Sequence, residues 1–232
     1  MKLNDFPHVL WINLDICTKR RKYMEDLLDQ YQLCHTRISA VNGINSYSTE
    51  LHTYCVPNSN LTRAENACTC SHLKALKYFV DKMPNDKVII FEDDVSFDFL
   101  PWIPFDWSDL VAHFPDNYQI IQLAITQTDV PNYLVRTTPE KKYYCSAAYL
   151  ITKAGAKNLL SKYYANDLGK YDLSNQLYAT ADSMITSSGH TFSIPIFTYK
   201  TDDSTIHPMH RYTHYRCKQQ QLVMWKFVAD HL

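Results

Sequence analysis

Residues 87–94, KVIIFEDD, are the stretch that most strongly decides the fold. Lys87 is followed by four apolar residues, and Pro84 ends the helical pattern that precedes them. We therefore predict a buried strand. Strands that are apolar on both faces are typical of parallel sheets covered by helices. The strand runs directly into three acids, Glu92, Asp93 and Asp94. Because ligands bind at the carboxyl ends of the strands in open α/β sheets, the stretch predicts both a fold class and the position of a site.

The segments on either side alternate between strand and helix patterns. Residues 9–14 are rich in strand formers, and apolar residues at helical spacing follow from Tyr23 to Tyr31. Thr62 and Glu65 form the capping box of a helix that extends to about residue 83. Residues 44–61 are predicted to be a polar loop and residues 97–117 a surface excursion. Further strands are expected at 38–41, 119–125, 147–151 and 192–196, and helices after Thr152, around Asp182 and over 219–232. This order indicates a parallel sheet with crossover helices.

Bulk composition is that of a globular protein. The chain has 232 residues, 46% hydrophobic and 20% charged, which favours one domain over 1–232. A net charge of −1 gives no electrostatic indication that the protein binds nucleic acid or an anionic membrane. No run approaches the ~20 apolar residues of a transmembrane segment, and residues 1–7 do not form a secretory signal, so we expect a cytoplasmic location.

The seven cysteines lack a paired C-x-x-C set and are expected to be reduced and mostly structural. The oligomeric state is left open.

The glycine content restricts how phosphate could be bound. Only four glycines are present, with no G-x-G-x-x-G or P-loop motif. Three adjacent acids at the end of a buried strand would repel one another unless a cation neutralises them. A Mn²⁺ or Mg²⁺ ion held by carboxylates and bridging to substrate phosphates is therefore the expected route. The alternative is that the acids form an ordinary solvated turn.

Several segments, in order along the chain, resemble glycosyltransferase family 25. They are the I-N-L opening at 12–14 with Arg20 downstream, the A-V-N-G turn at 40–43, residues 61–73 (LTRAENACTCSHL), the acid-tipped strand at 88–95, A-Y-L-I-T at 148–152 with Gly155 and Ala156, Asp182, and S-T-I at 204–206. The resemblance implies an α/β fold of GT-A type, a Rossmann-like three-layer sandwich with a mostly parallel central sheet. It also implies a UDP-sugar donor, a divalent metal and an inverting transfer. Ala64 and Ala67 stand where the family prefers glycine, and Cys17 where an arginine is common.

The resemblance assigns roles to individual residues. Asp94 is expected to ligate the metal directly, with Glu92 at the metal site through the ribose or a metal-bound water, and His207 as a third ligand. Asp182 is the candidate base that deprotonates the acceptor hydroxyl. Substrate-binding residues are expected to be Asn13, Leu14, Arg20, Glu65, His72 and Asp93. Structural alternatives remain for Glu65 as a capping residue, for Asp182 as a helix N-terminal acid, for Arg20 as a surface cation and for His72 as a core residue.

The predicted reaction moves a hexose, with galactose or glucose favoured, from a UDP-sugar to a hydroxyl of a glycan or hydroxylysine-type acceptor, which can be a glycosylated or hydroxylated protein. One alternative is a catalytically inactive relative that binds a glycan or a nucleotide sugar, consistent with Ala64 and Ala67. Another is a metal-dependent hydrolase or nucleotidyltransferase, which would need further acids or a basic set near Asp94. The sequence determines neither the donor sugar nor the acceptor and linkage.

Overall fold

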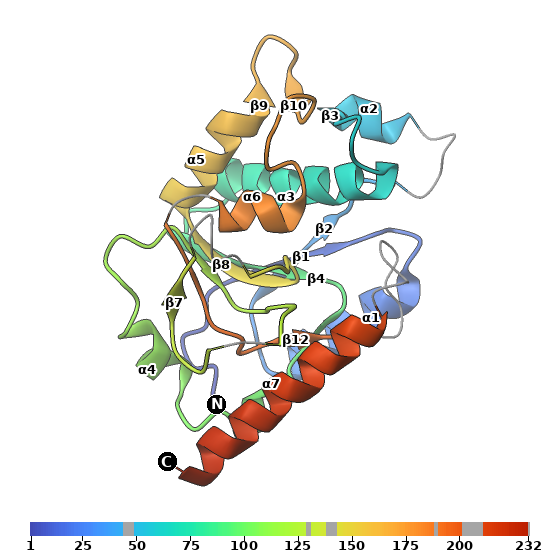
Figure 1. The fold of residues 1–232 in the computed structure, drawn as a ribbon. Helices are drawn as coiled ribbons and strands as arrows, with labels where there is room; N and C mark the ends of the chain where they lie inside the picture. Colours follow the sequence, from blue (N-terminus) through green and yellow to red (C-terminus); the bar gives the residue numbers. More distant parts are fainter. Residues whose placement is uncertain (44–48, 129–130, 138–142, 188–189, 201–210, 232) are drawn as a thin grey trace.

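A seven-stranded sheet lies at the centre of the protein (Figure 1). The structure is a computed structural model, and it describes residues 1–43, 49–128, 131–137, 143–187, 190–200 and 211–231. In spatial order the strands are β2 (His35–Ser39), β1 (Val9–Asn13), β4 (Lys87–Glu92), β8 (Ala148–Thr152), β6 (Ile120–Gln122), β11 (Thr191–Ser193) and β7 (Val135–Arg136). The predicted strands at 9–14, 87–91 and 147–151 thus correspond to β1, β4 and β8.

Five of the seven strands run in the same direction. β2, β1 and β4 are parallel, and so are β6 and β11. β8 is antiparallel to both β4 and β6, and β7 is antiparallel to β11. The predicted α/β fold with a mostly parallel central sheet is therefore confirmed. The carboxyl ends of β1 and β4 lie side by side, because Ile12 pairs with Glu92 in the register of these strands.

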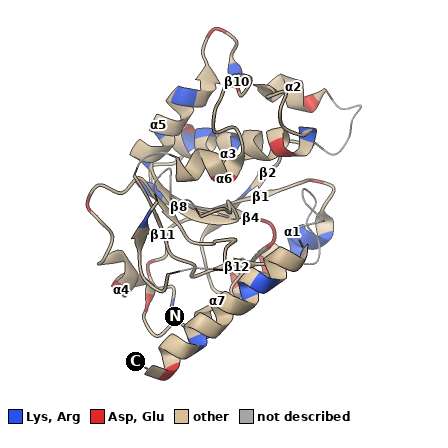
Figure 2. Ribbon diagram, viewed as in Figure 1, with Lys and Arg blue, Asp and Glu red and all other residues tan. Residues whose placement is uncertain are grey.

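Helices cover both faces of the sheet, which confirms the predicted three layers (Figure 1). One face carries α3 (Arg63–Lys82), α5 (Lys153–Tyr163) and α6 (Ala181–Thr186). The other carries α1 (Thr18–Gln30), the 3₁₀ helix η1 (Leu100–Trp102), α4 (Trp107–Val111) and α7 (Arg211–His231). In Figure 2, Lys and Arg colour parts of α1 and α7 blue. Within the described residues, no helix is both long enough and apolar enough to cross a membrane.

The apolar run of β4 is explained by two cores. Ile89 and Phe91 point into the core beneath α1 and α7, whereas Val88 and Ile90 point into the core beneath α3 and α5. All four side chains are fully buried. Because successive residues of a strand face opposite sides, a strand covered on both faces must be apolar at every position.

The prediction of a polar loop over 44–61 is wrong for residues 50–56, whereas residues 57–61 form turns and irregular chain as predicted. Residues 50–56 form α2 (Glu50–Tyr54) and β3 (Cys55–Val56). β3 pairs with β10 (Lys170–Asp172), which pairs in turn with β9 (Tyr164–Ala165). Leu51 and Cys55 are buried against α3. This partner lies more than 110 residues away along the chain, so local periodicity gives no sign of it.

The predicted surface excursion at 97–117 is also wrong. Phe99, Leu100 and Trp107 are buried core residues of η1, α4 and the turn before them. They pack with aromatic residues from distant segments, such as Phe6, whose ring centroid lies 4.6 Å from that of Trp107. Pro101 lies in the first turn of η1 and Asp106 is the N-cap of α4, while the buried aromatic side chains of this segment fill the core under the sheet.

The C-terminal helix is longer than the predicted 219–232, because α7 already begins at Arg211. Its buried side includes Trp225, whose indole Nε1 donates a hydrogen bond to the carbonyl of Pro195 at 2.6 Å. Near its start, α7 lies beside the short antiparallel pair of β5 (Val95–Ser96) and β12 (Thr198–Tyr199), where the His214 ring contacts that of Tyr199. The start of α7 therefore lies close to the chain segment that directly follows the acidic end of β4.

Candidate functional site

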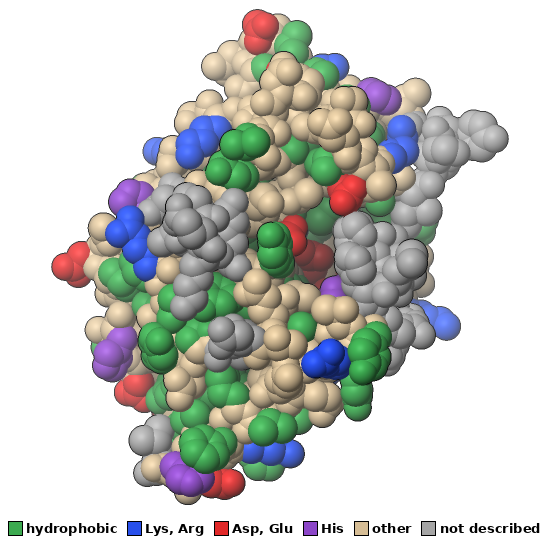
Figure 3. Space-filling view, in the orientation of Figure 1, with side chains coloured by type: hydrophobic (Ala, Val, Ile, Leu, Met, Phe, Trp, Pro, Cys, Tyr) green, Lys and Arg blue, Asp and Glu red, His purple; other side chains and the backbone are tan. Residues whose placement is uncertain are grey.

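Two cavities meet at the acidic end of β4. The small cavity, of about 80 Å³, lies between the ends of β1 and β4 and the start of α3. The large cavity, of about 640 Å³, lies between β4, α6 and the start of α7. Glu92 and Cys68 line both. Figure 3 shows acidic side chains at a hollow in the face drawn there.

Every predicted site residue within the described part of the chain lines one of these cavities. The small cavity is lined by Asn13, Leu14, Arg20, His72, Glu92 and Asp93. The large cavity is lined by Glu65, Glu92, Asp94 and Asp182. His207, like the S-T-I element at 204–206, lies outside the described residues. Residues predicted for different tasks, up to 169 positions apart in the sequence (Asn13 and Asp182), are therefore brought to one edge of the sheet.

Asn13 and Arg20 bind the acids after β4. Asn13, the last residue of β1, donates from Nδ2 to Asp93 Oδ2 at 2.6 Å. Arg20, in the first turns of α1, places its guanidinium 2.5 Å from Asp93 Oδ1 and 3.2 Å from Asp94 Oδ2. Its side chain is only 17% exposed, so Arg20 is not the surface cation that one alternative held it to be. The cation that partly neutralises the acids in this structure is a protein side chain.

Glu92 belongs to a second set of contacts, on the side of α3. Its Oε1 accepts a hydrogen bond from the Ser146 hydroxyl at 2.6 Å and lies 3.3 Å from Nε2 of His72. The other ring nitrogen of His72, Nδ1, lies 3.1 Å from the hydroxyl of Tyr149. A neutral His72 can donate to Glu92 from Nε2 while Nδ1 accepts from Tyr149. The residue is completely buried, so it is a core histidine whose polar edge lies at the site.

The three acids have different proton affinities. Burial raises the pKa of Asp94 to about 7, and the neighbouring charge of Glu92 adds to the shift while Arg20 opposes it. Burial also raises the pKa of Asp93, against the opposing effects of Arg20 and Asn13. Burial would raise the pKa of Glu92 as well, but the contacts with His72 and Ser146 lower it on balance. Without a metal, Asp94 is thus the acid that holds a proton most readily.

Asp94 fits the role of a metal ligand better than Asp93 does. Asp94 Oδ1 is buried and has no hydrogen-bond partner among the described residues. Both carboxylate oxygens of Asp93 are already bound, one by Asn13 and one by Arg20. A buried acceptor without a partner costs free energy unless a cation or water satisfies it. Carboxylate oxygens are the ligands that Mn²⁺ and Mg²⁺ prefer, so the donor atoms at Asp94 suit these ions.

Glu65 and Asp182 approach the large cavity from two helix starts. Thr62 and Glu65 form the predicted capping box, in which the amide of Thr62 donates to Glu65 Oε2 at 2.7 Å. Asp182 lies in the first turn of α6, whose N-cap is Thr180. The Thr69 hydroxyl donates to the carbonyl of Ala179 at 2.7 Å, which fixes the start of α6 against α3. The helix starts therefore hold both carboxylates at the cavity wall.

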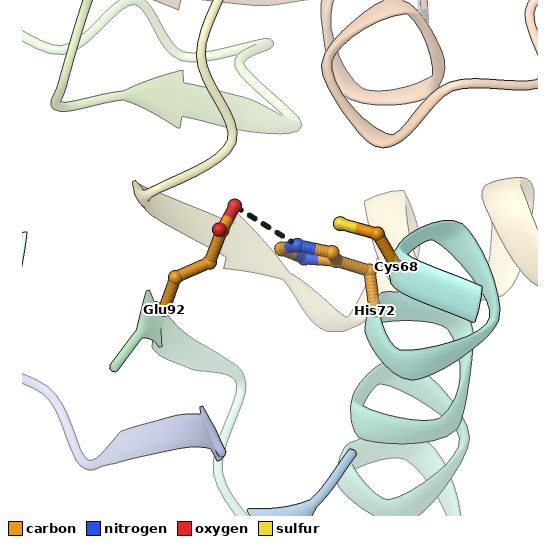
Figure 4. A group of neighbouring side chains, drawn as sticks. All are labelled: Cys68, His72 and Glu92. Carbon is orange, nitrogen blue, oxygen red and sulfur yellow. Dashed lines mark hydrogen bonds and ion pairs between the residues drawn. The ribbon is translucent and has the colours of Figure 1, made fainter. Parts of the chain in front are cut away.

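Cys68 was not predicted as a site residue, but it lies beside His72 and Glu92 (Figure 4). It occupies the position four before His72 on α3, so the two side chains project from the same helix face. The spacing of a cysteine and a histidine at i and i+4 was the available signal in the sequence.

Ala64 and Ala67, at positions where glycosyltransferase family 25 prefers glycine, lie in the wall of the small cavity. Ala64 and Ala67 face Gly43 so closely that a Cβ added to Gly43 would lie 2.6 Å from the Cβ of Ala67. Gly43 itself belongs to the A-V-N-G turn. The added Cβ would also lie 2.7 Å from the carbonyl oxygen of Arg63, so the start of α3 approaches this turn closely enough that only a glycine fits there.

Comparison with known protein families agrees with the sequence analysis for the first part of the chain. The model of glycosyltransferase family 25 (LPS biosynthesis protein) matches residues 6–100. This match confirms the resemblance for a stretch, less than half of the chain, that includes Asn13, Arg20 and the acids after β4. It does not extend to Asp182 or His207.

Among solved structures, the chain is similar to A197 from STIV, at 13% identity over 83% of this chain and 84% of that one, with a TM-score of 0.43. It is also similar to mouse xyloside xylosyltransferase 1 in its apo form, at 10% identity over 90% and 80%, with a TM-score of 0.37. A third similar structure is galactosyltransferase LgtC in complex with donor and acceptor sugar analogues, at 12% identity over 92% and 95%, with a TM-score of 0.37. No curated protein matched the chain.

Proposed function

We propose that the protein is a metal-dependent inverting glycosyltransferase of GT-A type that moves a hexose, galactose or glucose, from a UDP-sugar to a hydroxyl of a glycan or hydroxylysine-type acceptor. The observation that carries the proposal is the pair of cavities meeting at Glu92, which together are lined by all the predicted site residues that are described. A transferase needs two substrate sites that share one reacting centre. The family match supports the reaction class.

The small cavity is proposed to hold part of the nucleotide donor. Asn13, Leu14 and Arg20 line it from the end of β1 and the start of α1. Asn13 and Arg20 also bind Asp93, so they hold the acidic turn in place. Asp94, with Glu92 directly or through a water, would hold Mn²⁺ or Mg²⁺, and His207 is proposed as a further ligand. When bound, the metal neutralises charge on the departing diphosphate.

The large cavity is proposed to receive the acceptor. Inverting transfer requires one base that removes the proton of the acceptor hydroxyl as this oxygen attacks the anomeric carbon. Asp182 and Asp94 line the same cavity. In this proposal the proton moves to the carboxylate of Asp182, while Asp94 serves the metal. The two carboxylates thus have separate tasks in one space.

The test is hydrolysis of a panel of nucleotide sugars, which needs no known acceptor. We expect slow, metal-dependent hydrolysis of UDP-galactose or UDP-glucose by the wild type, and its loss in Asp94→Ala. Asp116→Ala, an exposed acid outside both cavities, is the matched control and should keep the activity. Hydrolysis at equal rates with and without Mn²⁺, or by Asp94→Ala, would contradict the proposal.

A binding protein without activity is the second candidate, and Ala64 and Ala67 favour it because they occupy the wall of a cavity of only about 80 Å³. Such a relative would bind UDP-sugar or glycan and leave it intact. Calorimetry of donor binding, run beside the hydrolysis assay, separates the two candidates.

A further inference from the structure

The side chains of Cys68, His72 and Glu92 converge at the wall between the two cavities (Figure 4). We propose that they bind a thiophilic divalent cation such as Zn²⁺, at a site that does not include Asp94. This inference does not depend on the transfer reaction proposed above.

The distances suit such an ion. One ligand atom from each residue lies within 4.8 Å of the other two, and Nε2 of His72 lies 3.3 Å from Glu92 Oε1. Bond lengths of about 2.0–2.3 Å in a tetrahedral zinc site place neighbouring ligand atoms roughly 3.3–3.8 Å apart. The three side chains therefore need only small rotations to surround one ion.

The ligand types select the metal. A thiolate with an imidazole and a carboxylate suits Zn²⁺, whereas Mn²⁺ and Mg²⁺ prefer oxygen alone. Three protein ligands leave one coordination position open, as in catalytic rather than structural zinc sites. Since Cys68 and Glu92 line both cavities, that position can be reached from either.

The surrounding hydrogen bonds orient the ligands. Nδ1 of His72 lies 3.1 Å from the hydroxyl of Tyr149 and, in the tautomer that binds a metal, carries the ring proton and donates it to that hydroxyl, so that the lone pair of Nε2 faces Glu92 and the ion. Ser146 donates to Glu92 Oε1 at 2.6 Å. Metal-binding histidines and carboxylates commonly have such partners, which fix the ring and the carboxylate. Glu92 would be shared with the proposed Mn²⁺ site, so the two ions would compete for it if that proposal also holds.

The experiment is a titration of the metal-free protein with Co²⁺, a spectroscopic substitute for Zn²⁺. We expect one equivalent of Co²⁺ to produce a thiolate-to-cobalt charge-transfer band that Zn²⁺ abolishes. Cys68→Ser should lose the band and bind Zn²⁺ ~10-fold or more weakly, at least the effect of losing an outer-shell partner. Cys145→Ser removes another thiol of the large cavity and should keep the band.

Two further measurements keep the test decisive. Zn²⁺ should protect Cys68 of the wild type from alkylation, read by peptide mass spectrometry, and this requires no variant. Asp94→Ala should retain the cobalt band even though it loses Mn²⁺-dependent hydrolysis, so failure of either proposal is visible separately. No thiolate band in the folded wild type, an unchanged band in folded Cys68→Ser, or no protection of Cys68 would overturn the inference.

Discussion

The two cavities differ in how the chain builds their walls. The small cavity is made from segments between Ile12 and Asp93, all inside the region that matches the family model. The large cavity gathers residues from Glu65 to His214, from α3, β4, α6, β12 and α7. The small cavity is thus formed within one continuous region of the chain, whereas the large cavity is formed by segments that are distant in the sequence. We therefore expect changes in the small cavity to act on binding and stability, and changes in the large cavity to act on turnover.

The largest effect is expected from Asp182→Asn in the large cavity. Asparagine keeps the shape of the side chain but cannot accept the acceptor's proton near neutral pH. Transfer should slow by ~10²- to 10⁴-fold, the usual contribution of a positioned base, while UDP-sugar and Mn²⁺ still bind normally. Steady-state transfer and calorimetry measure the two properties.

Asp109→Asn is the matched control for Asp182→Asn. Asp109 is an acid in the first turn of α4, outside both cavities, so this variant tests the helix-start role alone. Its transfer rate should remain close to that of the wild type. A wild-type rate in Asp182→Asn as well would mean that Asp182 only supports its helix.

The second prediction concerns stability at the small cavity. Arg20→Ala leaves the carboxylates of Asp93 and Asp94 buried without their cation, and should lower the free energy of unfolding by ~3–5 kcal/mol. Arg21→Ala, which breaks only the exposed pair with Glu25, should cost ~0.5 kcal/mol or less. Urea unfolding of both variants checks this. Equal, small losses would show that the buried network adds little to stability.

The third prediction uses the pH dependence of stability to test the raised pKa of Asp94, which lines the large cavity. The pKa of Asp94 is raised from 3.8 to about 7 in the folded protein, so its contribution to stability is present below about pH 4 and is lost as pH rises through 7. Without metal, the stability of the wild type relative to Asp94→Asn should therefore fall between pH 5 and pH 8. Mn²⁺ should oppose this fall, because it binds the ionised carboxylate. Denaturant unfolding at both pH values, with chelator and with Mn²⁺, measures the difference, which should be constant if Asp94 is not shifted.

The smallest effect is expected from Ala67→Gly, which widens the small cavity. UDP should bind a few-fold more tightly, while the helix loses ~1 kcal/mol of stability. Ala75→Gly, on the same helix but outside both cavities, should lose similar stability without any gain in affinity. Calorimetry with UDP decides whether the methyl group of Ala67 limits the donor site.

Much of the fold follows from short-range patterns in the sequence. The apolar run of β4 and the capping box at Thr62 depend on neighbouring residues, and both are found as predicted. The misassigned segments, 50–56 and 97–117, depend instead on partners far along the chain, such as β10 for β3.

The site shows the same division. The end of β4 could be recognised as acidic from the sequence, which led us to expect a metal as the neutralising cation. That Arg20 pairs with two of these acids depends on the angle at which α1 leaves β1, which no periodicity specifies. The place of Cys68 beside Glu92 likewise required α3 to be laid across the end of the sheet.

One consequence concerns how α3 would constrain changes of specificity. Its first turns supply Ala64 and Ala67 to one cavity, Glu65 to the other, and Cys68 to both. If the small cavity binds the donor and the large cavity the acceptor, a substitution at the start of α3 changes both binding sites at once. A change that improves binding of one substrate is then expected to weaken binding of the other. Libraries selected for a new acceptor should accordingly accumulate changes in α6 and residues 144–147, and leave α3 largely as it is.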